Sequence, residues 1–133
     1  MSGMARAHAM VGWGFVGLVA LQFFLAGLGM FGASDFTSHA INGTLLLLVA
    51  LVLVVLAAVG RLGRQAVTLS VLVLFLAALQ HVLPALRDGA PVVAALHPVN
   101  ALVLLVIGYA VARGRTLASL TAEPGASRAQ AVR

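Results

Sequence analysis

The chain has 133 residues, of which 62% are hydrophobic and 8% are charged, and its mean hydropathy is +1.13. Soluble domains carry about 25% charged residues, so this composition excludes an ordinary soluble domain and indicates an integral membrane protein. The sequence contains no cysteine, which excludes disulfide exchange and thiolate chemistry.

Four apolar segments predict four transmembrane helices, over residues 10–32, 39–60, 66–86 and 92–112. Each is close to the ~20 residues that a helix needs to cross the hydrocarbon layer. The links between the segments are short, which makes consecutive helices antiparallel neighbours. We therefore expect an all-α membrane fold, a four-transmembrane-helix bundle that forms one domain over residues 1–112.

The arginines are distributed unevenly about these helices. Seven of the eight precede the first helix, fill the second link or follow the fourth helix: Arg6, Arg61, Arg64, Arg113, Arg115, Arg128 and Arg133. Because arginine is enriched in cytoplasmic loops, both termini are predicted to lie in the cytoplasm of a bacterium, with 113–133 as a solvated, disordered tail. The net charge of +5 is then a topology signal and a contact with lipid headgroups, and no nucleic acid is expected as a partner.

Two matches to the dinucleotide-binding pattern G-x-G-x-x-G occur, at residues 12–17 and 27–32. That pattern works as a strand-to-helix turn, whereas both copies lie within or at the end of the predicted first helix. We predict instead that glycines here let helix backbones approach closely.

The chain resembles itself at an offset of 58 residues. "LQFFLAGL" (21–28) aligns with "LQHVLPAL" (79–86), and "HAINGTLLL" (39–47) aligns with "HPVNALVLL" (97–105). The polar residues in register are Gln22 with Gln80, His39 with His97, Asn42 with Asn100, and Arg6 with Arg64. We interpret the chain as two parallel helical-hairpin repeats related by a pseudo-twofold axis along the membrane normal. The first helix is then part of the fold and not a signal peptide.

Polar side chains within the predicted spans gather in the outer half, and an intramembrane polar side chain is a site hypothesis by default. The candidate site residues are His39, His97, His81, Asn42, Asn100, Gly43, Gln22 and Gln80. Two imidazoles that face each other across a bundle axis can ligate the iron of a b-type haem. His39 and His97 are therefore the candidate iron ligands, and Gly43 is expected to leave volume beside one of them.

Other interpretations of these histidines stay open. Each of His39 and His97 lies near an outer helix end, where an imidazole can also sit at the interface or cap the helix. His81 has Phe23 as its counterpart, and is an alternative ligand, a proton donor to a quinone, a haem-propionate contact or a partly hydrated residue. His8 is expected at the cytoplasmic interface. A quinone would use the same amides and imidazoles as a haem site.

The placement of one histidine near the outer end of the second helix and another near that of the fourth resembles one half of haem A synthase. The resemblance implies that His39 and His97 are haem ligands. Through "QFFLAGLG", "H-x-x-N-G" and "LHPVNAL", residues 5–113 also resemble a family of small bacterial four-helix membrane proteins of unknown function. The chain has one such unit and no intramembrane acid, so the likeness extends to haem or quinone binding and electron relay, not to haem oxidation.

We predict a b-type haem-binding electron-transfer protein of the cytoplasmic membrane, with quinol as a candidate electron donor. The alternative is a non-redox accessory or scaffold protein whose polar residues only pack helices. Beyond the bilayer, the expected partners are a second copy of the chain or a redox partner subunit. No hydrolytic, thiol or nucleotide-dependent chemistry is visible, and a proton-coupled exporter is disfavoured because no Asp or Glu lies inside a predicted span.

Overall fold

The computed structural model describes residues 2–114. The helices are α1 (Gly3–Met30), α2 (Thr37–Val59), α3 (Arg64–Ala85), α4 (Pro91–Ala94) and α5 (Leu96–Ala112). The described part of the chain contains no strand, and it has four helices long and apolar enough to cross a membrane when α4 and α5 are counted together. The predicted all-α fold with four helices of transmembrane length is confirmed. The predicted tail lies, from residue 115 onward, outside the described residues.

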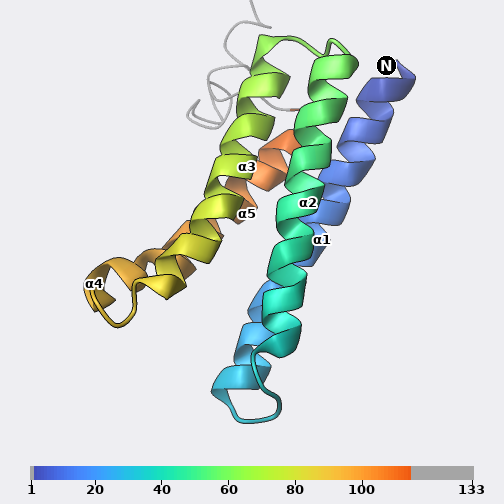
Figure 1. The fold of residues 1–133 in the computed structure, drawn as a ribbon. Coiled ribbons are helices and arrows are strands. Elements are labelled where there is room, and N and C mark those ends of the chain that lie inside the picture. Colours follow the sequence, from blue (N-terminus) through green and yellow to red (C-terminus); the bar gives the residue numbers. More distant parts are fainter. Residues whose placement is uncertain (1, 115–133) are drawn as a thin grey trace, which may run out of the picture.

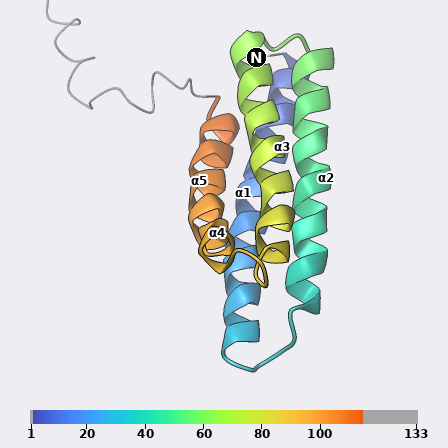
Figure 2. The same cartoon turned by 60° about the vertical axis from the view of Figure 1, so that its left-hand side comes forward.

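The four long helices form a ring in which α1 and α3 each pack against both α2 and α5. The helices α2 and α5 therefore lie diagonally across the bundle. The start of α1, the α2–α3 turn and the end of α5 lie at one end, which we call the arginine end because Arg6, Arg61, Arg64 and Arg113 are there (Figures 1 and 2). The opposite end, with the α1–α2 turn and α4, is called the histidine end.

The core is formed by apolar side chains from all four long helices, including Phe15, Leu53, Val73 and Leu104. Figure 1 shows that the α1–α2 hairpin and the α3–α5 hairpin are closest near the α2–α3 turn and diverge toward the histidine end.

The first helix begins at Gly3, seven residues before the predicted start at residue 10. Ser2 caps it, because its Oγ accepts a hydrogen bond from the Ala5 N–H at 3.2 Å. The first turns also carry Met4, Ala5 and Ala7, which have high helix propensity. Hydropathy alone places the start too late because it detects only the apolar part of the helix.

Two prolines shape the last helical segment. Pro91 begins α4, where its missing N–H costs no hydrogen bond. Pro98 lies in the first turn of α5, and it cannot donate to the carbonyl of Ala94, four residues earlier. The helix is accordingly interrupted at Ala95, and α5 begins at Leu96.

Glycines allow α1 and α5 to approach closely. A Cβ on Gly12 would lie 2.9 Å from the Ala112 Cα, and a Cβ on Gly108 would lie 2.9 Å from the Phe15 ring. Gly14 and Gly17 of the same sequence motif have no heavy atom within 4 Å of such a Cβ. The prediction of glycine-mediated packing is therefore confirmed at Gly12, and not at Gly14 or Gly17.

Candidate site at the paired histidines

His39 lies in the first turn of α2, and His97 lies in the first turn of α5. The two rings meet between the diagonal helices, with their centres 6.1 Å apart and their planes inclined by 60°. Both side chains are half-buried. The two histidines that the 58-residue offset pairs in the sequence are thus neighbours in space.

Gln22, on α1, holds His39 in place. The Gln22 amide donates to the His39 carbonyl at 2.9 Å and lies 3.3 Å from its Nε2, while His39 Nδ1 donates to the Gln22 carbonyl at 3.2 Å. These contacts fit a neutral imidazole protonated at Nδ1, with the tautomer assigned from the hydrogen-bond network. The lone pair of His39 is then on Nε2, which faces the amide.

Gln80, on α3, makes the corresponding contacts with His97. In the amide orientation that satisfies both of its polar atoms, Gln80 donates to the His97 carbonyl at 3.0 Å and to Nδ1 at 2.9 Å. Its oxygen accepts from the Ala101 N–H at 3.0 Å. The amide therefore contacts Nδ1 of His97, whereas the amide of Gln22 contacts Nε2 of His39.

Asn42 and Asn100 are both buried and bridge the two helices of their own hairpins. Asn42 Nδ2 donates to the Leu18 carbonyl at 3.0 Å, and Asn100 Nδ2 donates to the Leu76 carbonyl at 2.9 Å. Asn42 also donates to the Gln22 side-chain oxygen at 2.6 Å. Each hydrogen bond to a carbonyl thus recurs 58 residues later between equivalent atoms.

The space beside Gly43, which the sequence predicts to be open, is filled. A Cβ there would lie 3.2 Å from the Gln22 Nε2 and 3.9 Å from the His81 Nε2. The long amide of Gln22 fills this volume because it reaches across to His39. His81 itself is exposed, and its Nδ1 donates to the Ala77 carbonyl of its own helix at 3.1 Å.

His8, which the sequence predicts at the cytoplasmic interface, is buried between helices at the arginine end. Its Nε2 lies 3.0 Å from the Oγ of Ser70, which is fully buried on α3. Ser70 is not among the candidate residues predicted from the sequence. A hydroxyl within an apolar helix is a signal that would have found it, since such a group needs a partner.

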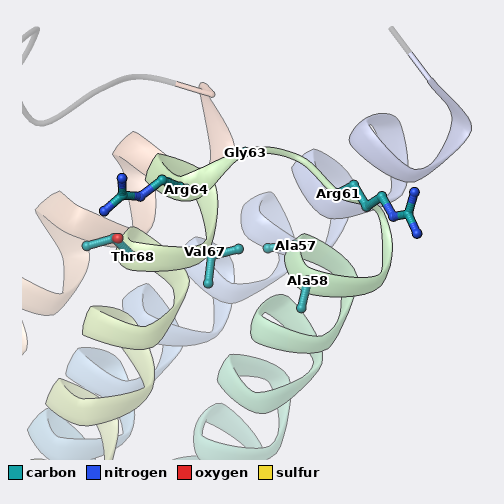
Figure 3. A pocket seen from close by; sticks show the side chains of 7 residues that line it. All are labelled: Ala57, Ala58, Arg61, Gly63, Arg64, Val67 and Thr68. Carbon is teal, nitrogen blue, oxygen red and sulfur yellow. The ribbon is translucent and has the colours of Figure 1, made fainter.

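A cavity of about 410 Å³ lies between the ends of α2 and α3. Figure 3 shows Arg61 and Arg64 extending away from each other on its two sides, with Ala57 and Val67 between them. The two guanidinium groups therefore do not converge on one anion.

The donor set at the histidine end consists of two adjacent imidazoles with amides behind them. Residues 2–114 contain no group of three or more His, Cys, Asp or Glu side chains arranged to hold a metal ion. This part of the chain therefore does not form a metal site in which protein side chains supply all the ligands. Two imidazoles suit a metal whose other ligands come from a cofactor, which is the case for haem iron.

The fold and these contacts define a multi-pass helical protein with a polar cluster at one end of an apolar bundle. Residues 22–86, about half of the chain, match a family model described as a family of unknown function (DUF6220). The expected likeness to a small uncharacterised family is thus confirmed over this segment. Searches of curated proteins and of solved structures each gave no match, so the resemblance to haem A synthase depends on the placement of the histidines alone.

Proposed function

We propose that the chain binds a b-type haem with His39 and His97 as its two axial ligands, and that it transfers electrons in a bacterial cytoplasmic membrane. The observation that carries this proposal is the 6.1 Å between the two ring centres. A metal–nitrogen bond to an imidazole is about 2 Å long, and the ring centre lies about 1 Å beyond the nitrogen. Two imidazoles on opposite sides of one ion would therefore have ring centres about 6 Å apart. The imidazoles thus have a separation that suits two ligands of one ion.

The recurrence of hydrogen bonds supports two parallel hairpin repeats. Gln22 and Gln80 each donate to the carbonyl of the histidine 17 residues later in the chain. A pseudo-twofold axis along the bundle gives the two histidines the same depth. The concentration of arginines at the opposite end supports a cytoplasmic location for both termini and an outer-face location for the site.

The amides would act as orienting groups. The Gln22 carbonyl accepts from His39 Nδ1 at 3.2 Å, and such a bond fixes the tautomer and ring orientation of a histidine ligand. For both imidazoles to offer a free lone pair, the Gln22 amide must rotate away from His39 Nε2 and the Gln80 amide must rotate away from His97 Nδ1. A bound haem supplies one-electron chemistry that no side chain of this chain offers.

A second candidate function is a non-redox scaffold. Every fully buried side-chain nitrogen and oxygen of the described residues has a hydrogen-bond partner, and Gln22 fills the space beside Gly43. These observations favour a network that only packs helices, with a second copy or another subunit as the partner. In that case the histidines are structural.

An absorption spectrum of the full chain, purified in detergent from haem-replete cells, separates the two candidates. The haem proposal predicts a Soret band and resolved α and β bands on reduction, lost in His39→Ala and in His97→Ala. His81→Ala is the matched control, and its spectrum should be unchanged because His81 is exposed and its Nδ1 donates to the Ala77 carbonyl of its own helix. A colourless wild-type protein contradicts haem binding and favours the scaffold.

A further inference from the structure

A second cavity, of about 630 Å³, lies at the arginine end among α1, α3 and α5. Its volume is within the ~300–1,000 Å³ of small-molecule sites. Small residues, among them Ala5, Ala9 and Ala66, make its walls, and four larger side chains carry its polar and aromatic groups: His8, Trp13, Gln65 and Arg113. Mostly apolar walls with a few polar groups are typical of a ligand site.

The imidazole in this cavity has one ring nitrogen engaged. His8 Nε2 lies 3.0 Å from Ser70 Oγ, and both residues are buried. Within residues 2–114 the structure shows no partner for Nδ1. When the Ser70 hydroxyl donates to Nε2, the Nδ1–H of His8 is available to donate to a ligand that reaches the cavity.

The aromatic wall is formed by Trp13. Its ring meets Tyr109 edge to face, with centres 5.6 Å apart, and Arg113 lies over Tyr109 at 5.9 Å from the ring centre. The indole makes this edge-to-face contact, yet 46% of Trp13 is exposed. A flat ring placed against the indole would cover surface that the protein leaves open.

We propose that this cavity binds the ring of a lipid-soluble quinone. A quinone is a flat, uncharged ring with carbonyl acceptors, which match the Nδ1–H of His8 and the amide of Gln65, and its apolar tail can leave between the helices into lipid. Its uncharged ring suits walls formed largely of alanine, leucine and valine. The proposal stands on residues at the arginine end and does not depend on haem binding at the histidine end.

The chain carries its own probe, because Trp13 is its one tryptophan. A short-chain ubiquinone is titrated into the detergent-purified full chain while tryptophan fluorescence is recorded. We expect saturable quenching with one quinone per chain. Ala9→Leu and Ala66→Leu, which fill the cavity from two walls, should raise the half-saturating concentration at least tenfold. Met10→Leu is the matched control, since Met10 is exposed and does not line the cavity.

Circular dichroism verifies that each variant keeps its helical content. If Ala9→Leu does not fold, Ala66→Leu provides the test. Quenching that rises in proportion to quinone without saturation would overturn the proposal, because it indicates collision within the micelle. Saturation at the same concentration in wild type and both filling variants would also overturn it, since the ligand would then lie elsewhere. Loss of saturation in Met10→Leu would contradict the assigned position as well.

Discussion

Asn42 and Asn100 show how a single side chain joins two helices in an apolar bundle. Each is buried, and each donates to a carbonyl on the preceding long helix, at 3.0 and 2.9 Å. Apolar surroundings offer no competing hydrogen bonds, although measured values for such bonds in membranes average only about 0.6 kcal/mol. Unlike Asn100, Asn42 makes a second hydrogen bond, which it donates to the Gln22 side-chain oxygen at 2.6 Å.

We expect Asn42→Ala to lower the free energy of unfolding by about 1–2 kcal/mol, and Asn100→Ala to lower it by about 1 kcal/mol. The loss is larger for Asn42→Ala because this substitution also removes the second hydrogen bond, and the Gln22 side-chain oxygen then has no donor. Denaturation in mixed micelles, followed by circular dichroism, measures both values. Thr44→Ala is the control, since Thr44 is exposed and its hydroxyl donates within its own helix. An equal or smaller loss for Asn42→Ala would contradict this account.

Rare polar residues in an apolar chain are informative, which is why the sequence alone identifies Gln22, Gln80 and the two asparagines as a group. Which atoms they contact depends on side-chain torsions that no spacing specifies. The filling of the space beside Gly43 by Gln22 is therefore visible only in the structure. The His8–Ser70 contact was missed for a related reason, because 62 residues separate its members and no repeat links them.

Close approach of two helices depends on which glycine faces the partner. Gly12 faces the Ala112 backbone on α5, whereas a Cβ on Gly14 would meet open space. Both glycines belong to the same sequence motif. The helical rotation of about 200° between positions two residues apart places them on different faces.

Gly12→Leu should lower the free energy of unfolding by about 2–3 kcal/mol, because the added side chain forces α1 away from α5. Gly14→Leu adds the same atoms toward open space and is expected to cause no loss. The comparison uses the same micelle denaturation, with helical content checked for both variants. Equal destabilisation by the two substitutions would show that the contact between Gly12 and Ala112 does not hold the helices together.

Hydropathy predicts the positions of the long helices because crossing the hydrocarbon layer needs a fixed length of apolar chain. The same signal cannot locate the interruption at Ala95. That break depends on whether the residues before Pro98 are already helical, since only then does its ring meet a carbonyl one turn earlier. The capped start of α1 is likewise a matter of local hydrogen bonding and not of hydropathy.

At the scale of the whole molecule, the proposed topology places the arginine end in the cytoplasm. The chain has no cysteine, so single cysteines can report each end without a background. We expect Ser34→Cys, in the α1–α2 turn, to react with a membrane-impermeant maleimide in intact spheroplasts. Gln65→Cys, in the first turn of α3, should react only after lysis. The reverse pattern, or labelling of both from outside, would contradict the orientation.

The four-helix architecture follows from composition and segment length, whereas the 58-residue offset predicts which polar residues of the two hairpins correspond. The ring of helices brings the first turns of α2 and α5 together across the bundle, and so sets His39 opposite His97. Composition alone does not predict that diagonal arrangement, since four short-linked helices pack in more than one order.

The identity of the axial ligands tests the central claim most directly. Near-infrared magnetic circular dichroism of the oxidised, purified full chain, together with haem quantification, reports which atoms bind the iron and how much haem each chain holds. The account predicts one low-spin haem per chain with two imidazole ligands, and loss of that signature in His39→Ala and in His97→Ala. A protein without haem, or a bis-imidazole signature that survives either substitution, would contradict it.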